Sequence, residues 1–367
     1  MSPPQLCLLA LAGSRAHGTD DEQSDVDVVG AALPNRQQLI GLFERFEQHT
    51  DEQSIAPLAV HLLPEEQEVA QRTKLEGSVF ELRKLLRLVT EANPNLLELL
   101  FVRDSEIRFS NSAGMLLLEH RDLFLTEKCR HTFGGYALSQ LKRIQLHHRW
   151  HHGDHPQAPR RSDFELPEAS KLSRDQVAAV DAEVRKQLER WQLDMSGVEP
   201  ALRIEIEQKL SQLLAELNLS TDESLWTAAA RWIGVDDNLL EILARERRWS
   251  VARSEWKRYQ TWLKNRNPER AALEAAHGYD TKHAAHLVRL LRMGREVLET
   301  GLLRVWRGDL DADELRAIRA GAWSYDRLLQ WAQEERDRLA SATAIVPAHT
   351  DRDAVERLCM ELLDRGE

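Results

Sequence analysis

The residues most able to do chemistry lie near the N-terminus, where Gly13-Ser14 follows one apolar run and Asp25-Val26-Asp27 opens another. A strand ending in Gly-Ser lets the chain turn sharply, so backbone N–H groups and the serine hydroxyl can approach phosphate oxygens. Side chains two apart on a strand share a face, which would place Asp25 and Asp27 side by side. Two metal ions about 3.5–4 Å apart would remove the repulsion between these carboxylates and favour in-line phosphoryl displacement.

Each half of this pattern has a simpler explanation when it stands alone. Gly-Ser is common in turns, and Asp-x-Asp is common in solvated loops and edge strands. Here ten residues separate Ser14 from Asp25, and Asp27 lies inside an apolar strand-like run. Buried aspartate is rare unless it is paired or bound to a metal. The combination therefore favours a metal-dependent site.

Short strands and helices are expected to position these residues. The apolar runs 6–12 and 26–32 are typical of buried strands, and 59–63 is a third strand candidate. Residues 36–47 and 81–92 are expected to be helical. Residues 130–136 are expected to form a loop before a helix over 137–150.

Composition divides the 367 residues into three segments: a mixed core over 1–105, a bridge over 106–165 and a helical domain over 166–367. The formal net charge of −11 argues against a chain coated by nucleic acid, but allows a local basic groove. The three cysteines form no CxxC pair, which favours a reducing cytoplasm without disulfides. No apolar run reaches the roughly 20 residues that span a bilayer, so no membrane partner is expected.

Several segments together resemble a known family. They are Gly13 to Val29, then Glu76-Gly-Ser-Val-Phe-Glu-Leu-Arg83-Lys84, Asn93-Pro94-Asn95, Gly135-Tyr136-Ala137, and Gly278-Tyr279-Asp280-Thr281-Lys282-His283. They are similar to the predicted nucleotidyltransferases linked with bacterial RNA-repair systems, the RlaP-like group of the DNA polymerase β-type superfamily. The resemblance covers roughly residues 5–160 and 275–335. It implies an α+β fold: a polymerase β-type core, made of a small mixed sheet with helices, followed by a large all-helical C-terminal region.

The resemblance also implies a third carboxylate on a later strand, which helps to hold the catalytic metal. The matching position is Glu76, where relatives more often carry aspartate, and a glutamate can still ligate Mg²⁺. Glu81 is the reserve candidate, and a surface residue before a helix is the simpler explanation of Glu76. Glu98 is expected early in a helix that Pro94 begins, where it would pair with a cation or act in catalysis.

A basic row is expected on a C-terminal helix. Lys282, His286 and Arg289 stand at i, i+4 and i+7, on one helix face. Such a row is usually just the solvated side of an amphipathic helix. The resemblance instead implies that a helical lobe supplies cations to the triphosphate, with Lys282 as the first candidate. Gly13, Ser14 and Arg15 would complete the nucleotide-binding set.

Two tracts, 128–161 and 245–270, each carry a net charge of +6. The second places Trp256 among Arg253, Lys257 and Arg258, a mixture that suits single-stranded nucleic acid, although the tryptophan could instead be core. In the first tract, His147 and His151 have a spacing that can bind zinc. No nearby cysteine completes such a site, and solvated histidines on a basic helix are commoner.

The sequence as a whole predicts an enzyme that transfers a nucleoside monophosphate from a nucleoside triphosphate such as ATP to an acceptor hydroxyl and releases pyrophosphate. Two Mg²⁺ or Mn²⁺ ions would bind Asp25, Asp27 and Glu76. RNA is the expected acceptor, by resemblance and because of the basic tracts. The alternatives are a protein or small-molecule acceptor with the same chemistry, as in toxin–antitoxin systems, and an RNA-binding scaffold without activity. The oligomeric state is not readable.

Overall fold

Two of the expected strands form the centre of the sheet. In the computed structural model, β1 (Gln5–Leu11) pairs antiparallel with β2 (Val26–Leu33), so the Gly-Ser turn and the aspartates lie at one end of this pair. The structure describes residues 5–22, 24–43, 45–153, 155–169, 237–264 and 268–365, with 179, 182, 183 and 234 as isolated positions. Most of the helical region expected between 170 and 236 lies outside these residues.

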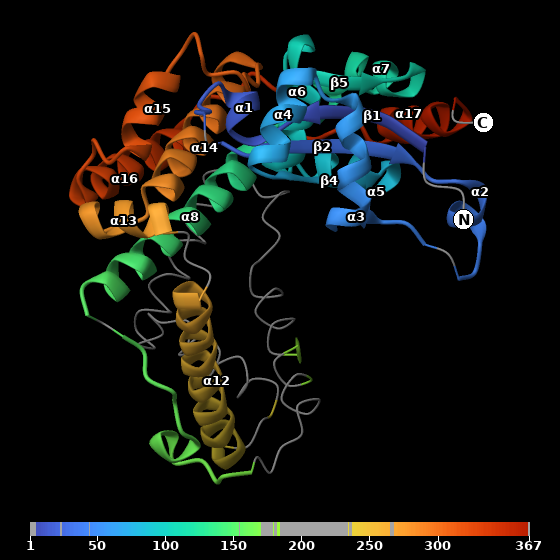
Figure 1. Ribbon diagram of the computed structural model, residues 1–367. Helices are drawn as coiled ribbons and strands as arrows, with labels where there is room; N and C mark the ends of the chain where they lie inside the picture. The colour runs from blue at the N-terminus through green and yellow to red at the C-terminus, as the bar shows by residue number, and fades with distance from the viewer. Residues whose placement is uncertain are drawn as a thin grey trace. The chain divides into compact units, whose positions relative to one another are not determined.

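The sheet has five strands in the order β3-β4-β2-β1-β5 (Figure 1). Strand β4 runs parallel to β2, whereas the other neighbouring pairs are antiparallel, so the sheet is mixed. This confirms the expected fold class of a small mixed sheet with helices followed by a large helical region. The remaining strands are β3 (Gln48–His49), β4 (Leu75–Glu81) and β5 (Ile107–Ser110).

Each face of the sheet carries its own core, because neighbouring strand residues point to opposite faces. Val26 and Val28 of β2 pack in a small core with Ile55 and Leu62. Ala31 and Leu33 of β2 belong to a much larger core, which continues into the C-terminal helices. The elements over the small core are α3 (Glu52–Ile55), the 3-10 helix η1 (Ala56–His61) and α4 (Pro64–Arg72). The helices of the large core include α5 (Leu82–Thr90), α6 (Pro94–Phe101) and α7 (Ser112–Glu119).

Three local expectations are corrected by the structure. The third strand expected over 59–63 is instead η1, which has a proline in its first turn, where the missing N–H costs nothing. The helix expected over 36–47 is only α2 (Arg36–Ile40) and ends at Gly41. The loop expected over 130–136 is the first part of α8 (Cys129–His151).

The last correction has a tertiary cause. Helix α8 packs along α14 (Thr281–Thr300), and the two helices approach closely at Phe133 and Gly294, where an added Cβ would lie 2.7 Å from the Phe133 Cβ. Phe133 is fully buried, and the Arg130 guanidinium donates to carbonyls at the end of α16 (Tyr325–Ser341). These contacts outweigh the low helix propensity of Gly134-Gly135.

Contacts divide the chain into two compact units, one comprising residues 1–153 with 267–367 and the other 154–266. The boundaries 105/106 and 165/166 proposed from the sequence do not coincide with this division. Within the described ranges, no helix is long and apolar enough to cross a membrane. The first unit ends with α13 (Pro268–His277), α14, α15 (Ala312–Arg319), α16 (Tyr325–Ser341) and α17 (Arg352–Asp364). The second contains η4 (Arg161–Phe164) and α12 (Asp237–Lys264).

Candidate active site

The parallel pairing of β2 with β4 brings together the carboxylates that the sequence analysis selected. Asp27 and Glu76 are register partners on adjacent strands. Asp25 lies just before β2 and two residues from Asp27, on the exposed side of the strand end. Glu76 lies within β4 and its side chain is half exposed, so the simpler explanation, a surface residue, also stays open.

The electrostatics of this group centre on Asp27, which is half-buried. Burial raises the pKa of Asp27, the Lys282 ammonium opposes this rise, and the carboxylates of Glu76 and Asp25 add to it. Glu76 accepts a hydrogen bond of 2.6 Å from Lys74, but both side chains are at least half exposed. Exposed ion pairs of this kind are worth only about 0–1 kcal/mol, so this pair leaves Glu76 available to a stronger ligand.

Glu81, the reserve candidate for the third carboxylate, lies too far along the strand. Its register partner is Ala32, five residues beyond Asp27, and a strand rises about 3.3 Å per residue, so the two positions are separated by roughly 16 Å. The Glu81 side chain also has another role. It accepts the Lys84 N–H at the start of α5 and pairs with Arg83.

Gly13 begins α1 (Gly13–His17), and the Gly13-Ser14 turn expected to bind phosphate is the start of this helix. Two observations explain why the residue at position 13 is a glycine. Its φ of +60° lies in the left-handed region, and a Cβ there would lie only 2.2 Å from Asp27 Oδ2. The preceding Ala12 N–H donates to the Asp27 carbonyl at 2.8 Å. Ser14 follows directly, so the turn and the aspartate form one continuous structure.

Arg15, expected to bind the nucleotide, is engaged with the loop before β2. Its Nε donates to the Asp25 carbonyl at 3.2 Å and its Nη2 to the Ser24 carbonyl at 3.0 Å, while Nη1 faces Asp20. These bonds fix the backbone that carries Asp25. The placement therefore assigns Arg15 a positioning role beside the carboxylates.

Lys282 lies in the first turn of α14, far from the aspartates in sequence. Its side chain is exposed, and its charge is the strongest cationic influence on the Asp27 carboxylate. Asp280 caps this helix by accepting the His283 N–H at 3.0 Å. The cap fixes where the helix begins and hence where the lysine emerges.

The other two members of the basic row do not face the carboxylates as free cations. The guanidinium of Arg289 is buried and donates to Glu98 Oε1 and to the Met293 sulfur. Burial, together with the nearby Arg289 charge, lowers the pKa of His286 to about 3, so the imidazole is neutral at physiological pH. Among the described residues, His286 Nε2 has no hydrogen-bond partner. Both placements argue against a role on the triphosphate.

A buried network holds α1 in place, and sequence reasoning did not find it. His17 Nε2 lies 2.9 Å from Glu98 Oε2, and the other oxygen of Glu98 accepts from Arg289. Glu98 therefore pairs with a cation, one of the two roles expected for it. The His17 carbonyl accepts from the Arg307 N–H at 3.0 Å, and the Gly18 carbonyl accepts from Arg316 at 2.5 Å. The C-terminal helical region thus anchors the end of α1.

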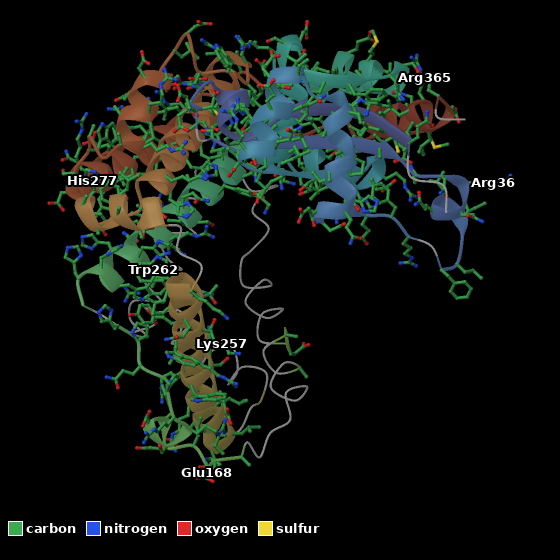
Figure 2. The ribbon with its side chains drawn as sticks, viewed as in Figure 1. Arg36, Glu168, Lys257, Trp262, His277 and Arg365 are labelled. Atoms are coloured by element: carbon green, nitrogen blue, oxygen red, sulfur yellow. The ribbon has the colours of Figure 1, made fainter. Side chains whose placement is uncertain are left out.

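The residues expected to bind RNA all lie on α12 of the second unit, from which side chains project along much of its length, including the labelled Lys257 (Figure 2). Lys257 and Arg258 are exposed, and Trp256 is half-buried. The tryptophan is therefore neither a fully buried core residue nor a fully exposed ring on which a base could stack. Arg253 stacks over the Trp249 ring at 5.0 Å.

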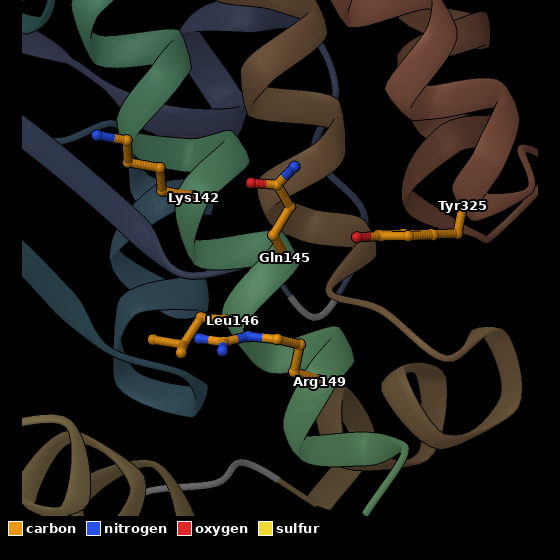
Figure 3. Close-up of a pocket in the computed structure, with 5 residues that line it drawn as sticks. All are labelled: Lys142, Gln145, Leu146, Arg149 and Tyr325. Carbon is orange, nitrogen blue, oxygen red and sulfur yellow. The ribbon is translucent and has the colours of Figure 1, made fainter. Parts of the chain in front are cut away.

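A pocket in the first unit is lined by other residues than the three carboxylates. Its lining residues come from α8 and from Tyr325 at the start of α16 (Figure 3). The Tyr325 ring stacks on His148 at 3.7 Å. An aromatic ring beside basic side chains suits a nucleotide, whose base is flat and whose phosphate is anionic. The α8 residues that line the pocket are Lys142, Gln145, Leu146 and Arg149.

The mixed sheet, the glycine turn against Asp27 and the carboxylates on adjacent strands agree with the polymerase β-type fold that the resemblance implies. Residues 3–153 match the RlaP family, which is described as the RNA repair pathway DNA polymerase beta family. The resemblance inferred from the sequence is confirmed over this part of the chain. No curated protein and no solved structure matches the chain.

Proposed function

We propose that the chain transfers a nucleoside monophosphate from a nucleoside triphosphate to an acceptor hydroxyl and releases pyrophosphate. The observation that carries this proposal is the register of β2 with β4, which sets Glu76 beside Asp27 with Asp25 two residues away. Three carboxylates at the end of two neighbouring strands, next to a glycine turn, are the components that phosphoryl transfer needs.

The donor set fits divalent cations. Carboxylate oxygens suit Mg²⁺ and Mn²⁺, and the mutual repulsion that contributes to the raised pKa of Asp27 is the kind that bound cations relieve. Asp25, Asp27 and Glu76 would hold the ions. When bound, a pair of such ions stabilises charge on both the attacking and the leaving oxygen.

The protein's own groups would bind and orient the triphosphate. Backbone N–H groups of the Gly13-Ser14 turn and the serine hydroxyl are suited to phosphate oxygens, and Lys282 supplies a point charge. Arg15 keeps the loop of Asp25 in place, and the His17–Glu98–Arg289 network keeps the turn in place. In this scheme catalysis rests on positioning and charge stabilisation.

RNA is the acceptor we propose. The family description names RNA repair, and α12 presents exposed Lys257 and Arg258 near the half-buried Trp256. In single-stranded complexes, cations follow the phosphate backbone while aromatic rings stack on bases. We infer that Arg253, Trp256, Lys257 and Arg258 contribute to this binding.

The test is incubation of the purified full chain with each labelled triphosphate, Mg²⁺ and a pool of RNA, protein and small-molecule acceptors. We expect label on RNA 3′ ends, pyrophosphate release, and loss of both in Asp25→Asn and Asp27→Asn. Glu119→Gln, a change at an exposed acid on α7, serves as the control and should retain activity.

Label on the chain itself, on another protein or on a small molecule would replace RNA as the acceptor. Absence of transfer with RNA binding intact would indicate the scaffold. Activity that survives in both aspartate variants would contradict the two-metal site.

A further inference from the structure

A second group of potential metal-binding side chains lies in the first unit, and none of them is among the carboxylates proposed to hold the catalytic ions. His147 Nδ1, a Glu274 carboxylate oxygen and an Asp280 carboxylate oxygen all lie within 4.8 Å of one another. His147 Nδ1 is 3.7 Å from Glu274 Oε1 and 3.6 Å from Asp280 Oδ2. The three ligands come from α8, from α13 and from the cap of α14.

Burial makes this arrangement unlike a surface cluster. The Asp280 side chain has no exposed area and that of Glu274 has 3%, while that of His147 has 12%. Two carboxylates side by side in so dry a place repel each other strongly, and each is costly to bury without a compensating charge. A divalent cation supplies that charge and uses an imidazole nitrogen and carboxylate oxygens as its ligands.

Neighbouring groups hold each carboxylate from its outer side. His151 Nε2 lies 3.2 Å from Glu274 Oε2. The backbone N–H of His283 donates to Asp280 Oδ1, and the His283 ring lies 3.5 Å from Asp280 Oδ2. Metal sites typically have such an outer layer, which orients the ligands and raises their affinity.

We propose that His147, Glu274 and Asp280 bind one divalent transition-metal ion, with His151 as the group that orients Glu274 or completes the coordination. Imidazole with carboxylate selects Zn²⁺ and its neighbours in the first transition row over Mg²⁺, which prefers oxygen ligands alone. This site is separate from the one at Asp25, Asp27 and Glu76.

The position of these ligands gives the ion a role. Helix α8 is the last element of the first unit before residues 154–266, and α13 is the first element after them. A metal bound by both helices and by the cap of α14 would tie together the places where the chain leaves this unit and returns to it. We therefore expect the ion to stabilise the unit whether or not nucleotide transfer occurs.

The test uses the full chain without a histidine tag and with Asp25→Asn and Asp27→Asn, so that the catalytic carboxylates do not compete for metal. After removal of metals with a chelator, Zn²⁺ binding is measured by competition with a chromophoric chelator, and the melting temperature is measured with and without Zn²⁺. Co²⁺ replaces Zn²⁺ in a parallel sample, in which visible absorption bands report the ligand set.

We expect one Zn²⁺ per chain, a higher melting temperature with Zn²⁺, and binding that Mg²⁺ does not displace. His147→Ala should abolish the site, and His151→Ala should weaken it roughly 10- to 100-fold. Glu274→Gln and Asp280→Asn keep the shape of each side chain, and Asp280→Asn also keeps an oxygen that can cap α14. Both variants should therefore fold, and both should bind Zn²⁺ more weakly than the parent chain.

The matched control is the neighbouring pair on the same helix. His148 and His152 also stand at i and i+4, and their rings stack at 4.1 Å, but His148 packs on Tyr325 away from the carboxylates. His148→Ala should leave Zn²⁺ binding unchanged. The proposal is overturned if the chain that keeps His147, Glu274 and Asp280 binds no Zn²⁺. It is also overturned if His148→Ala lowers Zn²⁺ binding as much as His147→Ala does. In the first case, a protonated His147 would balance the two carboxylates instead.

Discussion

Replacing Gly13 by alanine tests whether the turn and Asp27 work as one structure. The added Cβ would lie 2.2 Å from Asp27 Oδ2, whereas ordinary contacts between nonbonded atoms begin at roughly 3.5 Å. The carboxylate must therefore retreat by about 1 Å. A displacement of that size at a catalytic group can cost ~10²-fold in rate, equivalent to about 2.7 kcal/mol of barrier.

The same substitution also strains the backbone, and a second variant separates the two effects. Alanine at a φ of +60° costs roughly 1–2 kcal/mol of stability. Asparagine tolerates this conformation better but still adds a Cβ. We expect Gly13→Asn to recover part of the lost stability and none of the lost activity.

The assay is the initial rate of nucleotide transfer per folded chain, with melting curves for each variant. Gly135→Ala is the matched control, because this exposed helical glycine has nothing within 4 Å of an added Cβ. It should keep full activity and gain roughly 0.5–1 kcal/mol of stability. Wild-type rates in Gly13→Ala would refute the reasoning, because they would show that Asp27 need not hold its position against the turn.

Three further predictions concern the neighbouring residues. Glu76→Gln should lower the rate of transfer at least ~10²-fold. Glu81→Gln should mainly lower the melting temperature, because it weakens the cap of α5, which is worth about 1 kcal/mol. Equal transfer rates in the two variants would show that Glu76 is not the third carboxylate. Arg289→Met should lower the free energy of unfolding by about 3–5 kcal/mol, because it leaves the buried Glu98 carboxylate without the Arg289 guanidinium. The double variant Glu98→Gln/Arg289→Met should lose less stability than the sum of the two single variants. Urea unfolding measures all three. The pKa of His286 is about 3 in the folded chain and has its ordinary value in the unfolded chain. Below pH ~6.5 the unfolded chain therefore binds one proton more than the folded chain. The free energy of unfolding should fall by up to about 1.4 kcal/mol for each pH unit below that value. His286→Gln should remove this part of the slope, and an unchanged slope would contradict the burial of a neutral ring.

The sequence predicts those parts of the site whose signal is local. Asp25, Asp27 and the Gly-Ser turn lie within one short segment, and their spacing alone suggests the chemistry. Glu76 required the family resemblance, because no local pattern reveals which strand pairs with β2 or in what register.

Residues brought together by tertiary packing escaped prediction. His17 and Glu98 are 81 positions apart in the sequence, and Glu98 and Arg289 are 191 positions apart. No local sequence pattern around any of the three residues therefore predicts that they form a network. Arg289 and His286 have the spacing of a basic helix face, but that face turns toward the core. Gly134-Gly135 suggested a loop, and the packing of α8 on α14 made it a helix.

The discontinuous make-up of the first unit also affects how the protein can be synthesised. Helix α8 buries its apolar side against α14, which follows residues 154–266 in the chain. At roughly 5–20 residues per second, a ribosome needs about 6–23 s to produce that stretch. During this interval α8 lacks α14, the helix that meets it at Phe133. The nascent chain must therefore keep the apolar side of α8 soluble until α14 is synthesised.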